Sequence, residues 1–371
     1  MRPRARGLGI PFDGLPGPGN AITDVPGIAV GMTTLIRRAA AAQPQQIQTG
    51  VTAILPRGFS KPVTPVWAGQ FTLNGNGEMT GTHWLNDAGY FSGPVILTNT
   101  HAVGIAHHAA ASWMIEHYAE YFQNHHAWAM PVVAETYDGI LNDICGQHVT
   151  AEHVLAAIRT ATTDAPAEGN VGGGTGMQTY EFKGGTGTSS RRVDLAGNQY
   201  MVGALVQSNF GVRHELAIAG VPVGQHLADN ALLTELGGTE HGSIIVIIAT
   251  DAPLSPVQLQ RLARRGALGI GRTGTSGGHF SGDLMLAFST ANPVYQGAIG
   301  EAQPLLWSVG FLNDAHCDSF HAAAVQAVEE AVVNALVAAE SVPTFKPPGH
   351  VLSAIDHEAL RDVLRRFGRL R

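Results

Sequence analysis

The strongest structural signal in this sequence is the run Gly242-Ser243-Ile244-Ile245-Val246-Ile247-Ile248-Ala249-Thr250-Asp251. Its five consecutive β-branched aliphatic residues predict a strand that is buried on both faces, and the run is too short to span a bilayer. A serine stands directly after a glycine at the start of this strand, and the preceding residues 236–241 are typical of a turn. Taken alone, the pattern predicts a core strand with a serine at its edge.

The composition predicts a large and well-ordered fold. With 371 residues, of which 44% are hydrophobic and 14% charged, the chain can bury a large core. The net charge of −7 supplies no basic surface, which argues against nucleic acid as a partner. The 46 glycines follow no repeat, so we expect them in tight turns and at close backbone approaches. No long linker divides the sequence, and we expect a single domain over residues 1–371.

The cysteines and the first residues bear on the compartment. Cys145 and Cys317 are too few for a disulfide framework, and their separation fits no zinc motif. The basic start of the chain is not followed by the apolar core of a signal peptide, and no run is long enough to cross a membrane. We therefore expect a cytoplasmic protein without a membrane partner.

Strands and helices are mixed along the chain. Residues 1–27, rich in Gly, Pro and Arg, predict an irregular arm. Short apolar runs predict strands at 28–34, 50–55, 94–101, 131–139, 202–208, 243–250 and 284–288. Helical spacing of apolar residues predicts helices at 103–122, 151–160, 256–268, 322–339 and 353–367, the fourth of them amphipathic. Because the order lacks strict βα alternation, it predicts a mixed α/β fold with sheets covered on both faces.

Three glycine-rich motifs give no support for a cofactor. Residues 269–274 match G-x-G-x-x-G but follow a helix, whereas a dinucleotide site needs a strand there. Residues 274–278 match G-x-S-x-G but lack the strand before and the helix after a nucleophile elbow. The glycine loop 172–176 lacks the lysine of a P-loop. We expect no cofactor.

The 17 histidines do not form a recognisable metal motif. The pairs His107-His108 and His125-His126 are adjacent in sequence, so their side chains point in different directions on a helix or strand. No H-E-x-x-H motif is present. We expect ordinary surface and packing histidines and no metal.

Polar residues at the edges of the apolar strands are the remaining candidates for chemistry. They are Glu135 and Tyr137, Asn209, Ser243, and the run Ser281-Gly282-Asp283. Strand ends gather at the edges of a sheet, so these side chains could converge on one site. Taken singly, each is an ordinary turn or cap residue, and spacing alone does not establish convergence.

A series of longer motifs, in one consistent order, resembles a known family. The first motif is residues 98–104, which begin with Thr98-Asn99-Thr100-His101. The others are residues 131–139, 170–177, 207–211, 242–246, 249–254 and 281–283. This order is similar to that of the DmpA-type autoproteolytic aminopeptidases, which include L-aminopeptidase D-Ala-esterase/amidases and β-peptidyl aminopeptidases. The resemblance runs nearly from end to end of the chain.

The resemblance implies a fold and a processing event. The fold would be a four-layer αββα sandwich like that of N-terminal-nucleophile hydrolases, with different connectivity. The precursor would cleave itself between Gly242 and Ser243. The products, residues 1–242 and 243–371, would stay together without a covalent bond.

The resemblance also assigns roles to individual residues. Ser243 matches the family's nucleophile, Asn209 its oxyanion donor and Tyr137 a tyrosine of the active site. Glu135 matches a carboxylate that holds the amino group of the substrate. These roles imply an exopeptidase that releases small N-terminal residues from peptides, amides or esters.

Ser281 and Asp283 match a pair that orients and tunes the nucleophile, although some relatives carry Glu in place of Asp283. The proton acceptor is open between this pair and the α-amine that cleavage would create on Ser243, whose reference pKa is about 7.7–8.0. Gly242 would tolerate the strained backbone that an N→O acyl shift requires. Trp128, Phe210 and residues 274–278 are candidates for shaping the substrate pocket.

Two other functions remain as alternatives. Ornithine acetyltransferases also cleave themselves, but their nucleophile is threonine, and Ser243 argues against that chemistry. A non-catalytic small-molecule binder with the same fold is the other alternative, and the six matched polar residues argue against it. The expected partner is a small peptide or an aminoacyl amide or ester, and the resemblance implies a homo-tetramer of processed units.

Overall fold

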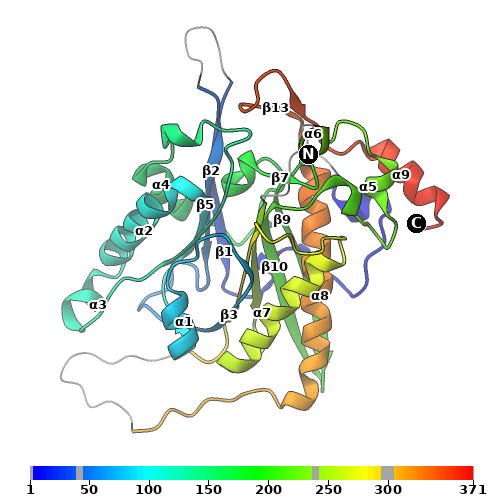
Figure 1. Cartoon of the computed structure of the whole chain (residues 1–371). Coiled ribbons are helices and arrows are strands. Elements are labelled where there is room, and N and C mark those ends of the chain that lie inside the picture. The colour runs from blue at the N-terminus through cyan, green and yellow to red at the C-terminus, as the bar shows by residue number, and fades with distance from the viewer. Residues whose placement is uncertain (1–2, 39–44, 236–241, 294–304, 371) are drawn as a thin grey trace.

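The computed structural model describes residues 3–38, 45–235, 242–293 and 305–370, and within them the chain forms two packed β-sheets with helices outside (Figure 1). The four-stranded sheet has the order β1-β2-β5-β6, and the six-stranded sheet has the order β4-β3-β12-β11-β10-β9. The strands of the first sheet are β1 (Ala29–Arg37), β2 (Ile47–Leu55), β5 (Val95–Asn99) and β6 (Val132–Thr136). Those of the second are β3 (Val66–Gly75), β4 (Tyr90–Phe91), β9 (Gly185–Leu195), β10 (Asn198–Asn209), β11 (Ser243–Thr250) and β12 (Gly282–Ser289). Two short pairs, β7 (Gln178–Thr179) with β8 (Phe182–Lys183) and β13 (Val342–Pro343) with β14 (Val351–Leu352), lie outside them.

The central strand β11 is buried along its whole length, as its sequence predicts. It runs antiparallel to β10 and parallel to β12, and all its residues are buried. Its side chains alternate between two cores, because neighbouring residues of a strand point to opposite faces. Ile244 and Val246 belong to the core beneath the helices, and Ile245 and Ile247 to the core between the sheets. The turn expected over residues 236–241 lies outside the described residues.

Helices cover the outer face of each sheet. The helices are α1 (Thr82–Ala88), α2 (Val103–His117), α3 (Ala119–Asn124), α4 (Ala151–Arg159), α5 (Val223–His226), α6 (Leu232–Glu235), α7 (Pro256–Gly271), α8 (Cys317–Ala338) and α9 (His357–Arg366). In Figure 1, α2 and α4 lie on the four-stranded sheet, and α7 and α8 lie on the six-stranded sheet. The layers are therefore αββα, and the predicted sandwich is confirmed. Among the described residues, no helix combines the length and the apolar character needed to cross a membrane.

Several expected elements differ in detail. The helix predicted over 103–122 is interrupted at Tyr118, which separates α2 from α3. The G-x-G-x-x-G stretch begins inside the last turn of α7, so the dinucleotide motif is accidental. The glycine loop 172–176 is a buried 3₁₀ turn, where a Cβ at Gly173 would lie 1.9 Å from the side chain of Gln207. The sequence analysis predicts neither β3 nor β9.

The prediction that α8 is amphipathic is wrong. All its residues from Ala327 to Val337 are buried, so no face of the helix is exposed to solvent along that length. The helix contacts β9 and β10 on one side, and α7 and the N-terminal arm elsewhere. A helix covered on several sides is largely apolar, and its buried polar residues Glu329, Glu330 and Asn334 are paired with other groups.

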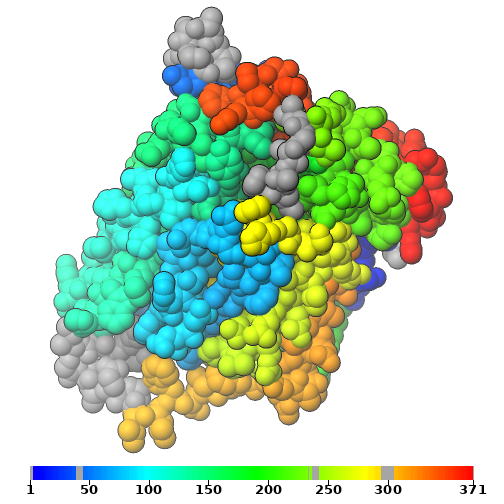
Figure 2. Space-filling view, viewed as in Figure 1, coloured from blue at the N-terminus to red at the C-terminus, as the bar shows by residue number. Residues whose placement is uncertain are grey.

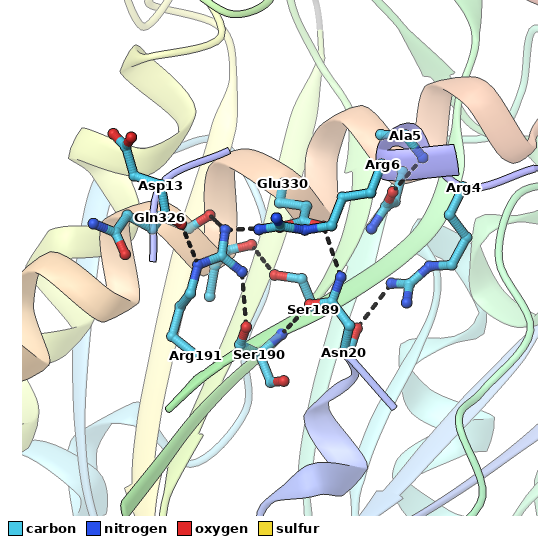
Figure 3. Close-up of polar contacts among 12 residues, drawn as sticks. Arg4, Ala5, Arg6, Asp13, Asn20, Ser189, Ser190, Arg191, Gln326 and Glu330 are labelled. Carbon is cyan, nitrogen blue, oxygen red and sulfur yellow. Dashed lines mark hydrogen bonds and ion pairs between the residues drawn. The ribbon is translucent and has the colours of Figure 1, made fainter. Parts of the chain in front are cut away.

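The N-terminal arm is fixed to α8 by a buried polar network (Figure 3). Glu330 of α8 accepts hydrogen bonds from Arg6 at 2.8 Å and from Asn20 at 2.6 Å. It also pairs with Arg191 of β9 at 2.7 Å, and both side chains of that pair are at most 1% exposed. Although burial alone would raise the pKa of Glu330, the two arginines lower it below its ordinary value. The arm is irregular, as expected, but firmly docked.

Candidate functional site

Ser243 lies where three strands of the six-stranded sheet meet. It pairs with Asn209, the last residue of β10, and with Gly282, the first residue of β12. Its Oγ donates a hydrogen bond to the Gly242 carbonyl oxygen at 2.7 Å. The Gly282 backbone N–H donates to the same oxygen at 3.2 Å. The hydroxyl therefore lies against the peptide bond predicted to break, and two donors polarise the carbonyl group of that bond.

Gly242 is required here by close packing. A Cβ at this position would lie 2.5 Å from the Asn209 carbonyl oxygen and 2.7 Å from Phe210 Cα. Both are backbone atoms, which cannot move aside as a flexible side chain could. The tolerance of strain that the sequence predicts for Gly242 stays a prediction, and the packing gives an independent reason for the residue.

The side chain of Asn209 is held in one orientation. Its Oδ1 accepts a hydrogen bond from the Gln178 backbone N–H at 2.9 Å, and its Nδ2 donates to the Tyr137 carbonyl oxygen at 3.1 Å. A carboxamide nitrogen carries two hydrogens, so a second donor of Nδ2 is available to a ligand. The structure thus brings Asn209, Tyr137 and Ser243 together from three strands or strand ends.

Ser281 and Asp283 form a directly bonded pair at the start of β12. Ser281 Oγ donates to Asp283 Oδ1 at 2.6 Å, and Asn74 Nδ2 donates to Asp283 Oδ2 at 2.9 Å. Burial raises the pKa of the Asp283 carboxyl, and hydrogen bonds from Ser281, Asn74 and the Ile244 backbone counteract part of that rise. Asp283 is also the register partner of Ile244, the residue that follows Ser243.

Glu135 is a buried carboxylate beside the same strand edge. It accepts hydrogen bonds from the Glu78 backbone N–H at 2.9 Å and from the Thr100 hydroxyl. Burial raises its pKa, and these two donors oppose the rise. A Cβ at Gly77 would lie 3.2 Å from Glu135 Oε1 and 3.5 Å from Gly282 Cα. Gly77 therefore lies between Glu135 and Gly282, the residue that pairs with Ser243.

Tyr137 stands at the exposed rim of this group. It is 41% exposed, and its ring folds back over Gly139, where a Cβ would lie 2.2 Å from the hydroxyl oxygen. Burial of part of the ring raises the pKa of the hydroxyl, and the neighbouring Cys145 and Asp138 raise it further. At neutral pH the phenol is therefore protonated and can donate a hydrogen bond.

Trp128 lies away from these residues within the chain. Its ring contacts Trp84, which contacts Tyr90 of β4. Tyr90 pairs with Trp67, and Trp67 with Ser289 at the far end of β12. Seven residues of strand, about 23 Å, separate that end from the Ser243 end. The structure does not bring Trp128 to the candidate site of its own chain.

Phe210 lies next to the site, but its ring belongs to the core. The residue is 2% exposed, and its ring packs against Tyr180 with centroids 5.1 Å apart. It supports the backbone beside Gly242 and presents no exposed surface to a substrate. Of the pocket candidates, the loop 274–278 is better placed, because the Gly278 carbonyl oxygen accepts a hydrogen bond from Asn74 at 3.2 Å.

Three contributors to this site were not predicted from the sequence: Asn74, Thr100 and the backbone of Gly282. Thr100 lies in one of the family motifs, and Asn74 lies in the turn motif Asn74-Gly75-Asn76-Gly77. The sequence therefore contained a motif that could have identified each of them. Gly282 acts through its N–H, which every residue type except proline offers. Together the groups provide a hydroxyl, a polarised carbonyl, a carboxylate pair and a separate carboxylate, which suits acyl transfer with recognition of a cation.

Comparison with known proteins agrees with this geometry. The model of peptidase family S58 matches residues 20–348. The β-peptidyl aminopeptidase BapA of Sphingosinicella microcystinivorans is 48% identical over 382 residues, which cover 99% of this chain and 93% of that protein. BapA of Sphingosinicella xenopeptidilytica is 44% identical, with 92% of this chain and 86% of that protein covered.

Solved structures give the same result. The L-aminopeptidase D-Ala-esterase/amidase of Ochrobactrum anthropi, a prototype serine aminopeptidase with a variant of the Ntn hydrolase fold, matches with a TM-score of 0.93 and 51% identity over the full length of both chains. A β-aminopeptidase of Burkholderia sp. matches with a TM-score of 0.88 and 44% identity over 99% of each chain. The resemblance drawn from the sequence motifs is confirmed. The chain belongs to peptidase family S58 and is a hydrolase of the aminopeptidase and amidase type.

Proposed function

We propose that this protein is a self-processing serine aminopeptidase that removes small N-terminal residues, β-amino acids among them, from peptides, amides or esters. The observation that carries the proposal is the placement of Ser243 Oγ at 2.7 Å from the Gly242 carbonyl oxygen, with the Gly282 N–H on the same oxygen. The β-peptidyl activity named for the two BapA relatives supports the substrate class.

The proposed processing step is an acyl shift followed by hydrolysis. Ser243 Oγ attacks the Gly242 carbonyl carbon, a C–O bond forms, and the C–N bond to Ser243 breaks. The hydroxyl proton ends on the leaving nitrogen, which becomes the α-amine of Ser243. Water then hydrolyses the ester, so residues 1–242 gain a carboxylate and residues 243–371 keep a free serine. The Gly282 N–H is positioned to stabilise the oxyanion formed from the Gly242 carbonyl.

The proposed peptidase reaction uses the new N-terminus. Glu135 pairs with the substrate ammonium, which restricts the enzyme to N-terminal residues. Ser243 Oγ attacks the first carbonyl carbon, its proton passes to the α-amine and then to the leaving amine, and water hydrolyses the acyl-enzyme. The free hydrogen of Asn209 Nδ2 donates to the oxyanion, and Tyr137 donates from the rim. Ser281 and Asp283 orient Ser243.

The test compares wild type with Ser243→Ala. Mass measurement is expected to find two fragments that meet at the Gly242–Ser243 bond in wild type, and an intact chain in the variant. Activity is then measured with aminoacyl p-nitroanilides and short β-peptides, and only wild type is expected to release the N-terminal residue. A wild-type chain that stays whole and inactive contradicts the proposal, and acetyl transfer without peptide hydrolysis would assign the acetyltransferase chemistry instead.

The assembly and compartment of the protein are also part of the proposal. We propose a homo-tetramer of processed units in the cytoplasm, with small aminoacyl compounds as the substrates. The family resemblance supports the tetramer, and exposed apolar side chains such as Trp128 and Trp307, each 51% exposed, offer surface for subunit contacts. Light scattering coupled to size-exclusion chromatography measures the mass; a monomer would contradict the assembly.

A further inference from the structure

Asn74 is bonded to the carboxylate of the serine–aspartate pair. Its Nδ2 donates to Asp283 Oδ2 at 2.9 Å and to the Gly278 carbonyl oxygen at 3.2 Å. Asn74 pairs with Asp283 across β3 and β12, and the register shifts immediately afterwards, which leaves Leu73 without a partner on β12. A bulge of this kind redirects a side chain next to it. The backbone of β3 therefore aims Asn74 at Asp283.

The turn that begins at Asn74 continues to the other carboxylate of the site. Asn76 Nδ2 donates to the Phe280 carbonyl oxygen at 2.6 Å, and the Glu78 N–H donates to Glu135 Oε1 at 2.9 Å. The space-filling view shows the light-blue segment that contains this turn directly beside the yellow loop that precedes β12 (Figure 2). One short turn thus contacts both the pair that serves Ser243 and the carboxylate proposed for the substrate ammonium.

We propose that Asn74 is a positioning residue for the proposed reaction: its side-chain amide holds Oδ2 of Asp283, so that Oδ1 faces the Ser281 hydroxyl. The inference rests on the proposed function, because it assumes that this pair orients Ser243. Asn74 does not itself touch the nucleophile, and it acts through Asp283.

The expected consequence concerns the charge of Asp283. The carboxyl is buried, which favours its neutral form, and the Asn74 hydrogen bond favours the ionised form. Without that donor the pKa of Asp283 rises further, so a larger fraction is protonated at a given pH. A protonated Asp283 can no longer accept the Ser281 hydroxyl in the same way, and activity falls as pH falls through this higher value.

The experiment uses Asn74→Ala, the isosteric Asn74→Asp and the control Gln70→Ala in the full chain. Gln70 lies on the same strand and loses a comparable amide bond, to Asn86 at 3.0 Å, far from Asp283 in register. Rates are measured against pH with one aminoacyl p-nitroanilide and normalised to the processed fraction. For Asn74→Ala, the acid limb of kcat is expected to move up by about one pH unit, so that kcat falls by up to about tenfold at pH values on that limb and by less at higher pH. KM is expected to change less than twofold, because Asn74 does not contact the substrate.

Asn74→Asp separates positioning from simple packing. It keeps the shape of the side chain but places a second carboxylate beside Asp283, so its acid limb is expected to move further than that of Asn74→Ala. Unchanged acid limbs in both variants, or the same shift in Gln70→Ala, would overturn the inference. Where a variant processes slowly, the pH dependence of its self-cleavage is measured, and the same shift is expected. Failure of the proposed function is distinguishable, since wild type itself would then be inactive or Ser243→Ala active.

Discussion

Lys183 is a buried lysine that forms no ion pair with any acidic side chain in the part of the chain that the structure describes. It is fully buried, and its Nζ donates to two backbone carbonyl oxygens, at 2.7 Å to Gly184 and 3.4 Å to Gly174. Neutral carbonyl groups do not replace the hydration of an ammonium group, so burial lowers the pKa of Lys183 to about 7. The fold therefore disfavours the charged form of this residue near neutral pH.

Lys183→Met, made in the unprocessed Ser243→Ala chain, is expected to change stability in a pH-dependent way. Because the pKa in the folded chain is about 7 and its ordinary value is 10.5, the unfolded chain binds more protons between these pH values, and the parent gains stability as pH rises through that window. Below about pH 7 the full cost of the buried charge is present. The thermal midpoint of Lys183→Met relative to the parent should therefore be most favourable near pH 6 and decline toward pH 9. A difference that does not vary with pH would contradict this.

The site residues differ in how far the sequence could predict them. Ser243, Asn209 and Tyr137 were assigned through family motifs, and the structure brings these three together. Asn74 was visible only as a turn residue, because its contact with Asp283 joins positions far apart in the sequence. The sequence analysis places Trp128 in the pocket because it is aromatic. In the structure, Trp128 lies near the opposite end of the sheet, and aromatic character alone does not predict the position of a residue along a sheet.

The turn after β3 sets the environment of Glu135. Gly75 and Gly77 are both exposed, and neither has φ in the left-handed region, so alanine fits the backbone at either position. Their surroundings differ: a Cβ at Gly77 would lie 3.2 Å from Glu135 Oε1, whereas at Gly75 the nearest atom would be 4.0 Å away, in Thr72. The two glycines therefore form a matched pair of test sites two residues apart in the sequence.

Gly77→Ala is expected to displace the Glu135 carboxylate by a few tenths of an ångström without unfolding the turn. The misplaced carboxylate should raise KM for substrates with a free amino group by about threefold to tenfold. Steady-state kinetics measures this, with Gly75→Ala as the control that keeps the wild-type KM. Equal KM values in both variants would show that the turn does not set the position of Glu135.

Strand β9 shows why a buried strand can escape prediction. Its first half, Gly185-Thr186-Gly187-Thr188-Ser189-Ser190, has little apolar surface, so the usual pattern of a buried strand is absent. A Cβ at Gly187 would lie 2.0 Å from the Ala331 carbonyl oxygen, and Ser189 Oγ donates to the Ala327 carbonyl oxygen at 2.6 Å. The strand is buried because small residues let α8 approach closely. By contrast, β11 and the start of α7 at Ser255 and Pro256 were correctly predicted, since local sequence determines both.

Across the whole molecule, the network around Glu330 joins the two proposed fragments. Arg6 and Arg191 belong to residues 1–242, and Glu330 belongs to residues 243–371. Because Arg191 and Glu330 are almost completely buried, removing the carboxylate leaves a buried guanidinium without its anion. Breaking one side of such a pair costs about 3–5 kcal/mol.

Glu330→Gln is therefore expected to weaken the association of the processed fragments while leaving the site itself unaltered. Size-exclusion chromatography in increasing urea should separate the fragments of this variant at a lower concentration than those of wild type. Glu358→Gln is the control, because its exposed pair with Arg361 lies within one fragment. Identical urea profiles for wild type and Glu330→Gln would contradict the assigned role.

The strand order determines whether the two fragments can exchange between molecules after cleavage. β11 and β12 of residues 243–371 lie between β10 and β3 of residues 1–242, hydrogen-bonded to both. Once the proposed cut is made, neither half can leave without opening two ladders and the core on each side of them. The two fragments of a processed molecule would therefore not exchange with fragments of other molecules. A mixture of isotopically heavy and light processed enzyme should contain no hybrids, and a defect in one half could not be complemented by an intact half from another molecule.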